Sequence, residues 1–278
     1  MHKTTSCLLL ALAAIAIQSA QAQKFIVLHQ FTGGKDGAQS QAGLTMDSTG
    51  TLYGTTSNAA GNAKGLGTVF RLSHSGSNWA FKTLHSFKGG FDGAYPLGRV
   101  IIGPNGTLYG TTNQGGNGFC NGSGCGTVFN LKLRGAETVL YRFTGDIDGA
   151  NPETADLVFD PAGNIYGTTG IGGSASLGVV YKLTFAYGSW AESVLHSFAG
   201  GIGDGAIPYG GVIFDNIGDL YGTTTYGGSE NEGTVFQLTP SGKYWTENMM
   251  IMHLTQTTVK RIFFLPELRV SELSLAHT

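Results

Sequence analysis

The chain has 278 residues, of which 45 are glycine and only 12% are charged, and its formal net charge is -2. It contains no run of like charges, so the basic surface that holds a nucleic-acid backbone is missing and we expect no nucleic-acid partner. The glycines follow no three-residue period and occur with tyrosine, phenylalanine, threonine and valine, which predicts an all-β protein of short strands and tight turns.

Residues 1–22 have the pattern of a secretory signal peptide. A basic start precedes an apolar stretch from Cys7 to Ile17, and Ala20-Gln21-Ala22 supplies the small residues of a cleavage site. The apolar stretch is shorter than the roughly 20 residues that a membrane-spanning helix needs. We therefore expect cleavage after Ala22, a secreted product in the periplasm or outside the cell, including its surface, and no membrane span in the mature chain.

Residues 23–247 contain four tandem repeats of about 56 residues, recognised by four markers in constant order. The markers are LHSF, DGA, LYGTT and GTVF or close variants of them. They begin at Leu28, Leu84, Leu140 and Leu195 (LHSF type), at Asp36, Asp92, Asp148 and Asp204 (DGA), at Leu52, Leu108, Ile165 and Leu220 (LYGTT type), and at Gly67, Gly126, Gly178 and Gly233 (GTVF type). This period identifies the repeat domain.

The hydrophobic pattern within one repeat is that of four antiparallel strands. Residues 212–214 and Leu220-Tyr221 flank a turn-forming cluster and predict a hairpin, and the GTVF and LHSF segments supply the third and fourth strands. Such a unit buries its faces only against its neighbours, as blades of a β-propeller do. Short hairpins favour a propeller of four blades over the alternative, a β-solenoid. The segment Lys24–Phe31 resembles a fourth strand and is expected to close the ring by completing the last blade.

Cys120 and Cys125 lie in a glycine-rich loop of a chain bound for an oxidising compartment. No further cysteine or histidine ligand with zinc-site spacing lies nearby. We therefore expect a local disulfide that braces this loop.

Residues 248–278 depart from the repeat. Where LHSF and DGA are expected, the sequence continues with Met249-Met250-Ile251-Met252 and contains no apolar run of membrane-spanning length. Two interpretations remain open: an unrelated C-terminal extension, or loss of the reading frame near residue 248.

The repeated markers resemble the GloVer tandem repeat, a bacterial family of secreted and cell-surface proteins with a choice of anchor. The resemblance covers about Leu28 to Glu247 and rests on LHSF, DGA, LYGTT and GTVF in that order. It implies an exported protein with propeller-like repeats that is often tethered by its C-terminal segment. It implies no catalytic residues.

The recurring polar residues are expected to be structural. The DGA aspartates are typical of turns, although Asp146 and Asp148 together form a weak candidate for calcium; we expect no other cofactor. The histidines of the LHSF segments are expected to be half-buried strand residues. Glu137, Glu192 and Glu247, each three residues before an LHSF position, are expected on a solvent face.

The sequence predicts a monomeric binding or display module for an unknown glycan or protein, with contacts from the loops in which the repeats differ. The alternative is a carbohydrate-active enzyme of the glycosidase or lyase type that uses Glu153 and Asp156, and the sequence does not decide between them. The candidate binding residues are Asn58, Asn62, Asn113, Gln114, Asn117 and Asn121.

Overall fold

The computed structural model describes residues 24–58, 65–76, 78–116, 120–241 and 244–250. The chain divides into two units, Met1–Gln30 and Phe31–Thr278, and all strands lie in the second. In the first unit, residues 24–30 form neither strand nor helix. The expected signal peptide and residues 251–278 of the tail lie outside the described residues.

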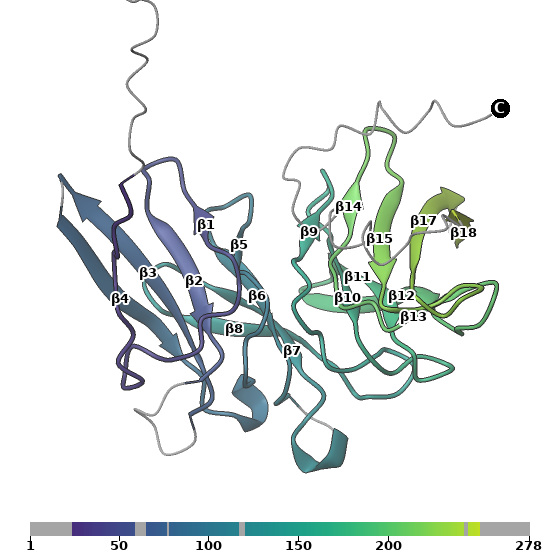
Figure 1. Cartoon of the computed structure of the whole chain (residues 1–278), viewed down its shortest axis with the longest axis horizontal. Helices are drawn as coiled ribbons and strands as arrows, with labels where there is room; N and C mark the ends of the chain where they lie inside the picture. Colours follow the sequence, from purple (N-terminus) through teal and green to yellow (C-terminus); the bar gives the residue numbers. More distant parts are fainter. Residues whose placement is uncertain (1–23, 59–64, 77, 117–119, 242–243, 251–278) are drawn as a thin grey trace, which may run out of the picture. The chain divides into compact units, whose positions relative to one another are not determined.

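The second unit contains four four-stranded antiparallel sheets, each a meander (Figure 1). The first two sheets consist of β1 (Thr45–Met46), β2 (Leu52–Thr56), β3 (Thr68–Ser75) and β4 (Asn78–Ser86), and of β5 (Ile101–Ile102), β6 (Leu108–Thr112), β7 (Thr127–Leu131) and β8 (Glu137–Arg142). The third consists of β9 (Val158–Phe159), β10 (Ile165–Thr169), β11 (Val179–Ala186) and β12 (Ser189–Ser197). The fourth consists of β14 (Ile213–Phe214), β15 (Leu220–Thr224), β17 (Thr234–Ser241) and β18 (Tyr244–Met250), and β13 (Gly205–Ala206) pairs separately with β16 (Tyr226–Gly227).

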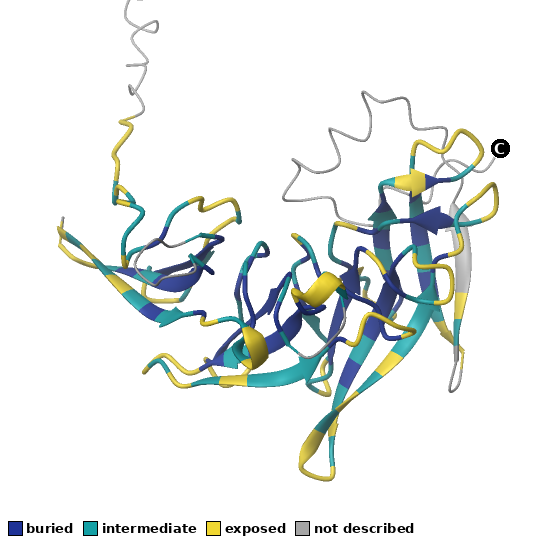
Figure 2. Ribbon diagram, turned by 90° about the horizontal axis from the view of Figure 1, so that it is seen from below, coloured by how far each residue is buried: buried dark blue, intermediate teal, exposed yellow. Residues whose placement is uncertain are grey.

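The predicted all-β fold of four-stranded, propeller-type units is thus confirmed. The solenoid alternative is wrong, because each four-stranded sheet takes its strands from a single repeat. Central strands are the most buried and hairpin tips the most exposed (Figure 2).

The first two strands of each sheet are joined by the turn that the sequence predicts. In the first sheet, Asp47 Oδ1 accepts the amides of Thr49 and Thr51, at 2.9 and 3.0 Å, and Gly50 adopts a φ of 81°. Tyr53 of the LYGTT segment then donates its hydroxyl to Asp47 Oδ2 at 3.0 Å. The turn is therefore fixed from both the backbone and the neighbouring strand.

The glycine of LYGTT is required by the packing of the next strand. A Cβ on Gly54 would lie 2.6 Å from the ring of Phe70, and one on Gly222 would lie 2.4 Å from the ring of Phe236. The aromatic residue of the GTVF segment thus covers the glycine of its own sheet. This contact explains why a glycine occupies the middle of a buried strand.

Neighbouring repeats are joined by aromatic contacts. The phenylalanine that ends each LHSF segment meets the aromatic residue of the next GTVF segment edge to face, as Phe87 does with Phe129 at a centroid distance of 5.2 Å. The same contact joins Phe143 to Tyr181 at 5.1 Å. Fully buried rings at these positions carry the core from one repeat to the next.

The structure does not confirm the expected closure by the N-terminal strand. The outer edge of β17 is occupied by β18, which pairs with it from Ser241↔Tyr244 to Val235↔Met250. A local hairpin orders far fewer residues than the return of a distant terminus does, so β18 forms despite its departure from the LHSF pattern. Phe31 instead contacts Phe70 at 5.2 Å, which is the repeat contact described above.

Candidate functional site

Two sets of loops leave the same ends of the strands. In the first sheet, Thr56 pairs with Thr68 and Thr68 with Ser86, so the β2–β3 loop and the DGA loop that follows β4 begin at one edge. Backbone bridges tie the two sets together, for example Ala94↔Gln114 and Ala150↔Ile171. The loops thereby form one continuous edge, which we call the loop edge.

The DGA aspartates fix the loops that contain them. Asp92 accepts the amide of Lys88 at 2.6 Å, and its Oδ1 lies 3.1 Å from Nε2 of His85. Burial raises the pKa of Asp92, but the bonds from His85 and Lys88 outweigh burial and hold the pKa below its usual value. Asp204 is held in the same way by Ala199 and His196. We call this arrangement, in which the DGA aspartate bonds a strand side chain and a backbone amide of its own loop, the loop lock.

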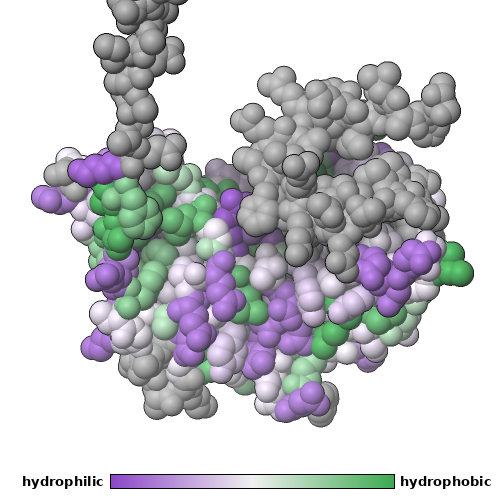
Figure 3. Space-filling model, viewed as in Figure 1, coloured by the Kyte–Doolittle hydropathy of each residue, from purple (hydrophilic) through white to green (hydrophobic). Residues whose placement is uncertain are grey.

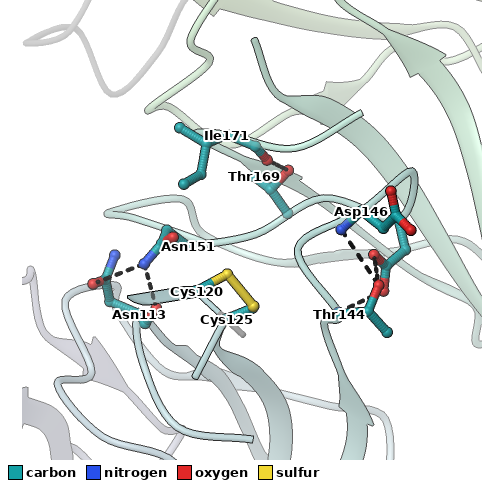
Figure 4. Close-up of a disulfide and its surroundings, with 9 residues drawn as sticks. Asn113, Cys120, Cys125, Thr144, Asp146, Asn151, Thr169 and Ile171 are labelled. Atoms are coloured by element: carbon teal, nitrogen blue, oxygen red, sulfur yellow. Dashed lines mark hydrogen bonds between the residues drawn. A yellow bond between two sulfur atoms is a disulfide. The ribbon is translucent and has the colours of Figure 1, made fainter. Parts of the chain in front are cut away.

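The candidate binding residue Asn113 faces inward. Its side chain and backbone are 8% exposed, and its carbonyl oxygen accepts Nδ2 of Asn151 at 2.9 Å (Figure 4). Asn58 and Gln114 use their backbones in the bridges that join the loops. All three residues thus lie within the loop edge, and their role in ligand binding stays a prediction.

The other three candidate binding residues are Asn62, Asn117 and Asn121. Asn121 is exposed and adopts a φ of 53°, which places it in a tight turn. Asn62 and Asn117 lie outside the described residues.

The structure joins Cys120 and Cys125 by a disulfide, with their Cα atoms 5.2 Å apart (Figure 4). Cys125 is fully buried. A Cβ on Gly145 would lie 2.6 Å from Sγ of Cys120, so the disulfide packs directly on the next DGA loop. The bridge therefore braces one loop of the loop edge against its neighbour.

The two calcium candidates differ in their surroundings. Asp148 is buried, and its carboxylate accepts the hydroxyl of Tyr141 at 2.9 Å and both the amide and the hydroxyl of Thr144. Asp146 is exposed, and its amide donates to Oγ1 of Thr144 (Figure 4). Asp148 thus serves as the loop lock of its repeat.

Glu153 and Asp156, the residues of the enzyme alternative, have separate partners. Asp156 accepts Nε of Arg99 at 3.0 Å and forms an ion pair with the same guanidinium. Burial raises the pKa of Glu153, and a hydrogen bond with Asn113 opposes that rise. The structure therefore engages each acid in its own contact.

A cavity of about 330 Å³ lies between the first and second sheets. It is lined by Met46, Asp47, Ser48, Tyr53, Ile102, Gly106, Leu108 and Leu133. Its single carboxylate, Asp47, is already bound by the β1–β2 turn, so the cavity has the character of a packing gap.

The expectation that Glu137 and Glu192 lie on a solvent face is wrong. Glu137 and Glu192 hold one register position, opposite Leu131 and Leu183, and the Oε1 atom of each is buried without a hydrogen-bond partner. The DGA loop of the preceding repeat covers them, and burial together with its aspartate raises the pKa of each glutamate to about 7.

A signal for this burial was present in the sequence. The same register position in the first sheet belongs to Phe81, opposite Leu72. Phe81 stacks on Phe70 at a centroid distance of 5.4 Å. Because this position holds a half-buried aromatic residue in the first sheet, comparison of the repeats indicates that it is covered in the other sheets as well.

The Gloeobacter/Verrucomicrobia repeat model matches residues 15–201 and 118–260. The chain belongs to this family. Its GloVer repeats are the four sheets described above, so the resemblance seen in the sequence is confirmed. No curated protein matches the chain.

The GloVer chain is also similar to solved structures. An oxidoreductase (glucose dehydrogenase) of Thermus thermophilus matches with a TM-score of 0.45 and 16% identity, covering 77% of this chain and 72% of that one. A protein of unknown function from Dyadobacter fermentans matches with a TM-score of 0.45 and 14% identity, covering 75% and 68%. Likeness at this level carries no conclusion about activity.

Within the described residues of the GloVer chain, no helix combines the length and the apolar character that spanning a bilayer requires.

Proposed function

We propose that this GloVer protein is an exported binding module that takes a protein ligand on its loop edge. One observation carries the proposal. Phe91, Ile147 and Ile202 lie just before the DGA aspartates of successive repeats and are 64%, 71% and 73% exposed. The loops are already fixed by aspartate, glycine and backbone bonds, so their folding does not require exposed apolar side chains at these points.

The chemistry of these side chains favours a protein over a glycan. Branched aliphatic groups such as those of Ile147 and Ile202 pack against apolar side chains and offer neither a flat ring nor a hydrogen bond to a sugar. The guanidinium of Arg142 lies over the ring of Phe91, 5.6 Å from its centroid, and covers part of the one aromatic face.

Elsewhere the surface lacks this regularity. The face seen in Figure 3 carries apolar residues at several separate places among hydrophilic ones. Phe185, 58% exposed, contacts the ring of Trp190 at a centroid distance of 5.4 Å and lies near the tip of the β11–β12 hairpin, at the strand ends opposite to the loop edge. It therefore provides a matched control.

The test compares the full chain with the triple variant Phe91→Ser, Ile147→Ser and Ile202→Ser and with Phe185→Ser, screened against a phage-displayed peptide library and a glycan array. We expect enriched peptides to bind the triple variant at least tenfold more weakly and to bind Phe185→Ser normally. Equal peptide binding by all three proteins, or binding of glycans alone, would overturn the proposal.

Export is tested separately. Expression of the full chain in a bacterial host and N-terminal sequencing of the recovered protein should give Gln23 as the first residue. Recovery of the uncleaved chain from the cytoplasm would contradict export without affecting the binding test.

A further inference from the structure

Three metal-ligating side chains meet where the first repeat contacts the second. His85 lies on β4, Asp92 lies in the following DGA loop, and Glu137 lies on β8 of the next sheet. One nitrogen and two carboxylate oxygens from these residues all lie within 4.8 Å of one another. Within the described part of the chain this is the only group of its kind.

The cluster contains an unused acceptor. Oε1 of Glu137 is buried and receives no hydrogen bond from a donor group; its neighbour is a second carboxylate, Asp92, and the two acids form a hydrogen bond only when one of them carries a proton. Arg142, the nearby cation, directs its Nε to the carbonyl oxygen of Phe91 at 3.3 Å. A buried carboxylate oxygen without a donor is costly unless a ligand completes its surroundings.

We propose that His85, Asp92 and Glu137 bind a divalent transition-metal ion, with zinc as the best match. Imidazole nitrogen combined with carboxylate oxygens suits zinc and its neighbours, whereas calcium and magnesium favour oxygen ligands alone. Three protein ligands leave one position of a tetrahedral zinc ion for water or for an external group. This inference is independent of the proposed protein ligand.

The geometry is close to that of a zinc site. Ligand atoms about 2.0–2.2 Å from a tetrahedral zinc ion lie about 3.4 Å from one another. His85 Nε2 and Asp92 Oδ1 already lie 3.1 Å apart, and the amide of Lys88 orients the carboxylate through Oδ2. Only the flexible side chain of Glu137 needs to move. The movement is small, because its oxygen already lies within 4.8 Å of the other two ligand atoms.

The next repeat contains a natural control. Tyr141, Asp148 and Glu192 occupy the positions equivalent to those of His85, Asp92 and Glu137. The hydroxyl of Tyr141 donates to Asp148, and burial with this bond raises its pKa, so the phenol keeps its proton and is a poor metal ligand. Replacing one histidine by tyrosine therefore preserves the lock and removes the nitrogen.

The fourth sheet repeats part of the pattern. His196 lies 3.2 Å from Asp204, and Glu247 holds the register position opposite Leu238, but the described structure does not include its side chain. Binding is therefore best measured as a change in stoichiometry between variants.

The experiment uses the full chain without a polyhistidine tag, stripped with a chelator and titrated with zinc and with cobalt by calorimetry and absorption spectroscopy. His85→Tyr and Glu137→Gln should each remove one equivalent of metal or weaken it at least tenfold. Glu192→Gln, the matched control, should leave binding unchanged. Tyr141→His should add one equivalent, and the further change Glu192→Gln should abolish that gain.

Circular dichroism and thermal unfolding of each variant establish that it is folded, and the gain in Tyr141→His is informative even if His85→Tyr is unstable. Absence of zinc binding at micromolar concentration by the wild-type chain would overturn the proposal. Binding that both His85→Tyr and Glu137→Gln retain in a folded state would overturn it as well.

Discussion

Replacing Glu192 by glutamine should stabilise the protein at alkaline pH and leave it unchanged in acid. Burial, followed by the charge of Asp148, raises the pKa of Glu192 from 4.5 to about 7 in the folded state. A carboxyl with a raised folded pKa binds its proton more tightly when folded, so its contribution to the free energy of unfolding falls as pH rises from 4.5 to 7. Above pH 7 the buried charge is a full penalty, which glutamine removes.

The magnitude follows from the shift and the burial. A rise of this size corresponds to about 3 kcal/mol at 1.36 kcal/mol per pKa unit. The side chain is only half-buried, and solvent screening reduces the value, so we expect the variant to gain about 1–2 kcal/mol at pH 8 and only a fraction of that at about pH 5, where the carboxyl is protonated in the folded chain but already partly ionised in the unfolded chain. For a domain of this size that gain raises Tm by about 2–8 °C.

The assay is urea unfolding, followed by tryptophan fluorescence, of the wild-type chain and Glu192→Gln at about pH 5 and pH 8. Glu232→Gln serves as the control, because Glu232 is exposed, and it should match the wild type at both values. A Glu192→Gln variant that is no more stable than the wild type at pH 8 would show that the DGA loop does not desolvate this carboxylate.

Three further changes test the fold. Phe129→Ala removes a fully buried ring that joins two repeats and should cost about 3–5 kcal/mol in urea unfolding, whereas a loss below about 1 kcal/mol would contradict a continuous core. Gly149→Ala places a Cβ 2.3 Å from Thr169 and should destabilise by more than Gly163→Ala, which also has positive φ but open space; equal Tm values would refute the steric reason. Changing Cys120 and Cys125 to serine should cost about 2 kcal/mol in the chain-entropy account of a short loop, and an unchanged Tm would show that the bridge constrains nothing.

The sequence was sufficient to predict those features of the fold that depend only on residues close together in the chain. The Asp47 turn, the glycine after it and the LYGTT and GTVF strands are local patterns, and each repeat presents them again. The short spacing of Cys120 and Cys125 likewise allows a bridge without knowledge of the rest of the chain.

Features that depend on contacts between repeats do not follow from the residues of one repeat alone. Glu137 reads as an exposed residue on an alternating strand, because nothing in its own repeat reveals that the preceding DGA loop covers it. From its own repeat, Asn113 is expected to be an exposed loop residue, but it is buried and its carbonyl oxygen accepts a hydrogen bond from Asn151 of the next repeat. Strand β18 lacks the LHSF sequence, but it forms because it pairs with the edge of β17 that would otherwise be open.

A metal site formed by two repeats would also affect how the repeats hold together. His85 and Asp92 belong to one repeat and Glu137 to the next, so an ion bound by all three stabilises their interface and not either sheet alone. In a repeat protein the total stability is a sum of unit and interface contributions, and a ligand that binds only the folded interface adds its binding free energy to that one interface. Because Tyr141 replaces the histidine at the next interface, the two interfaces would respond differently to the same ion.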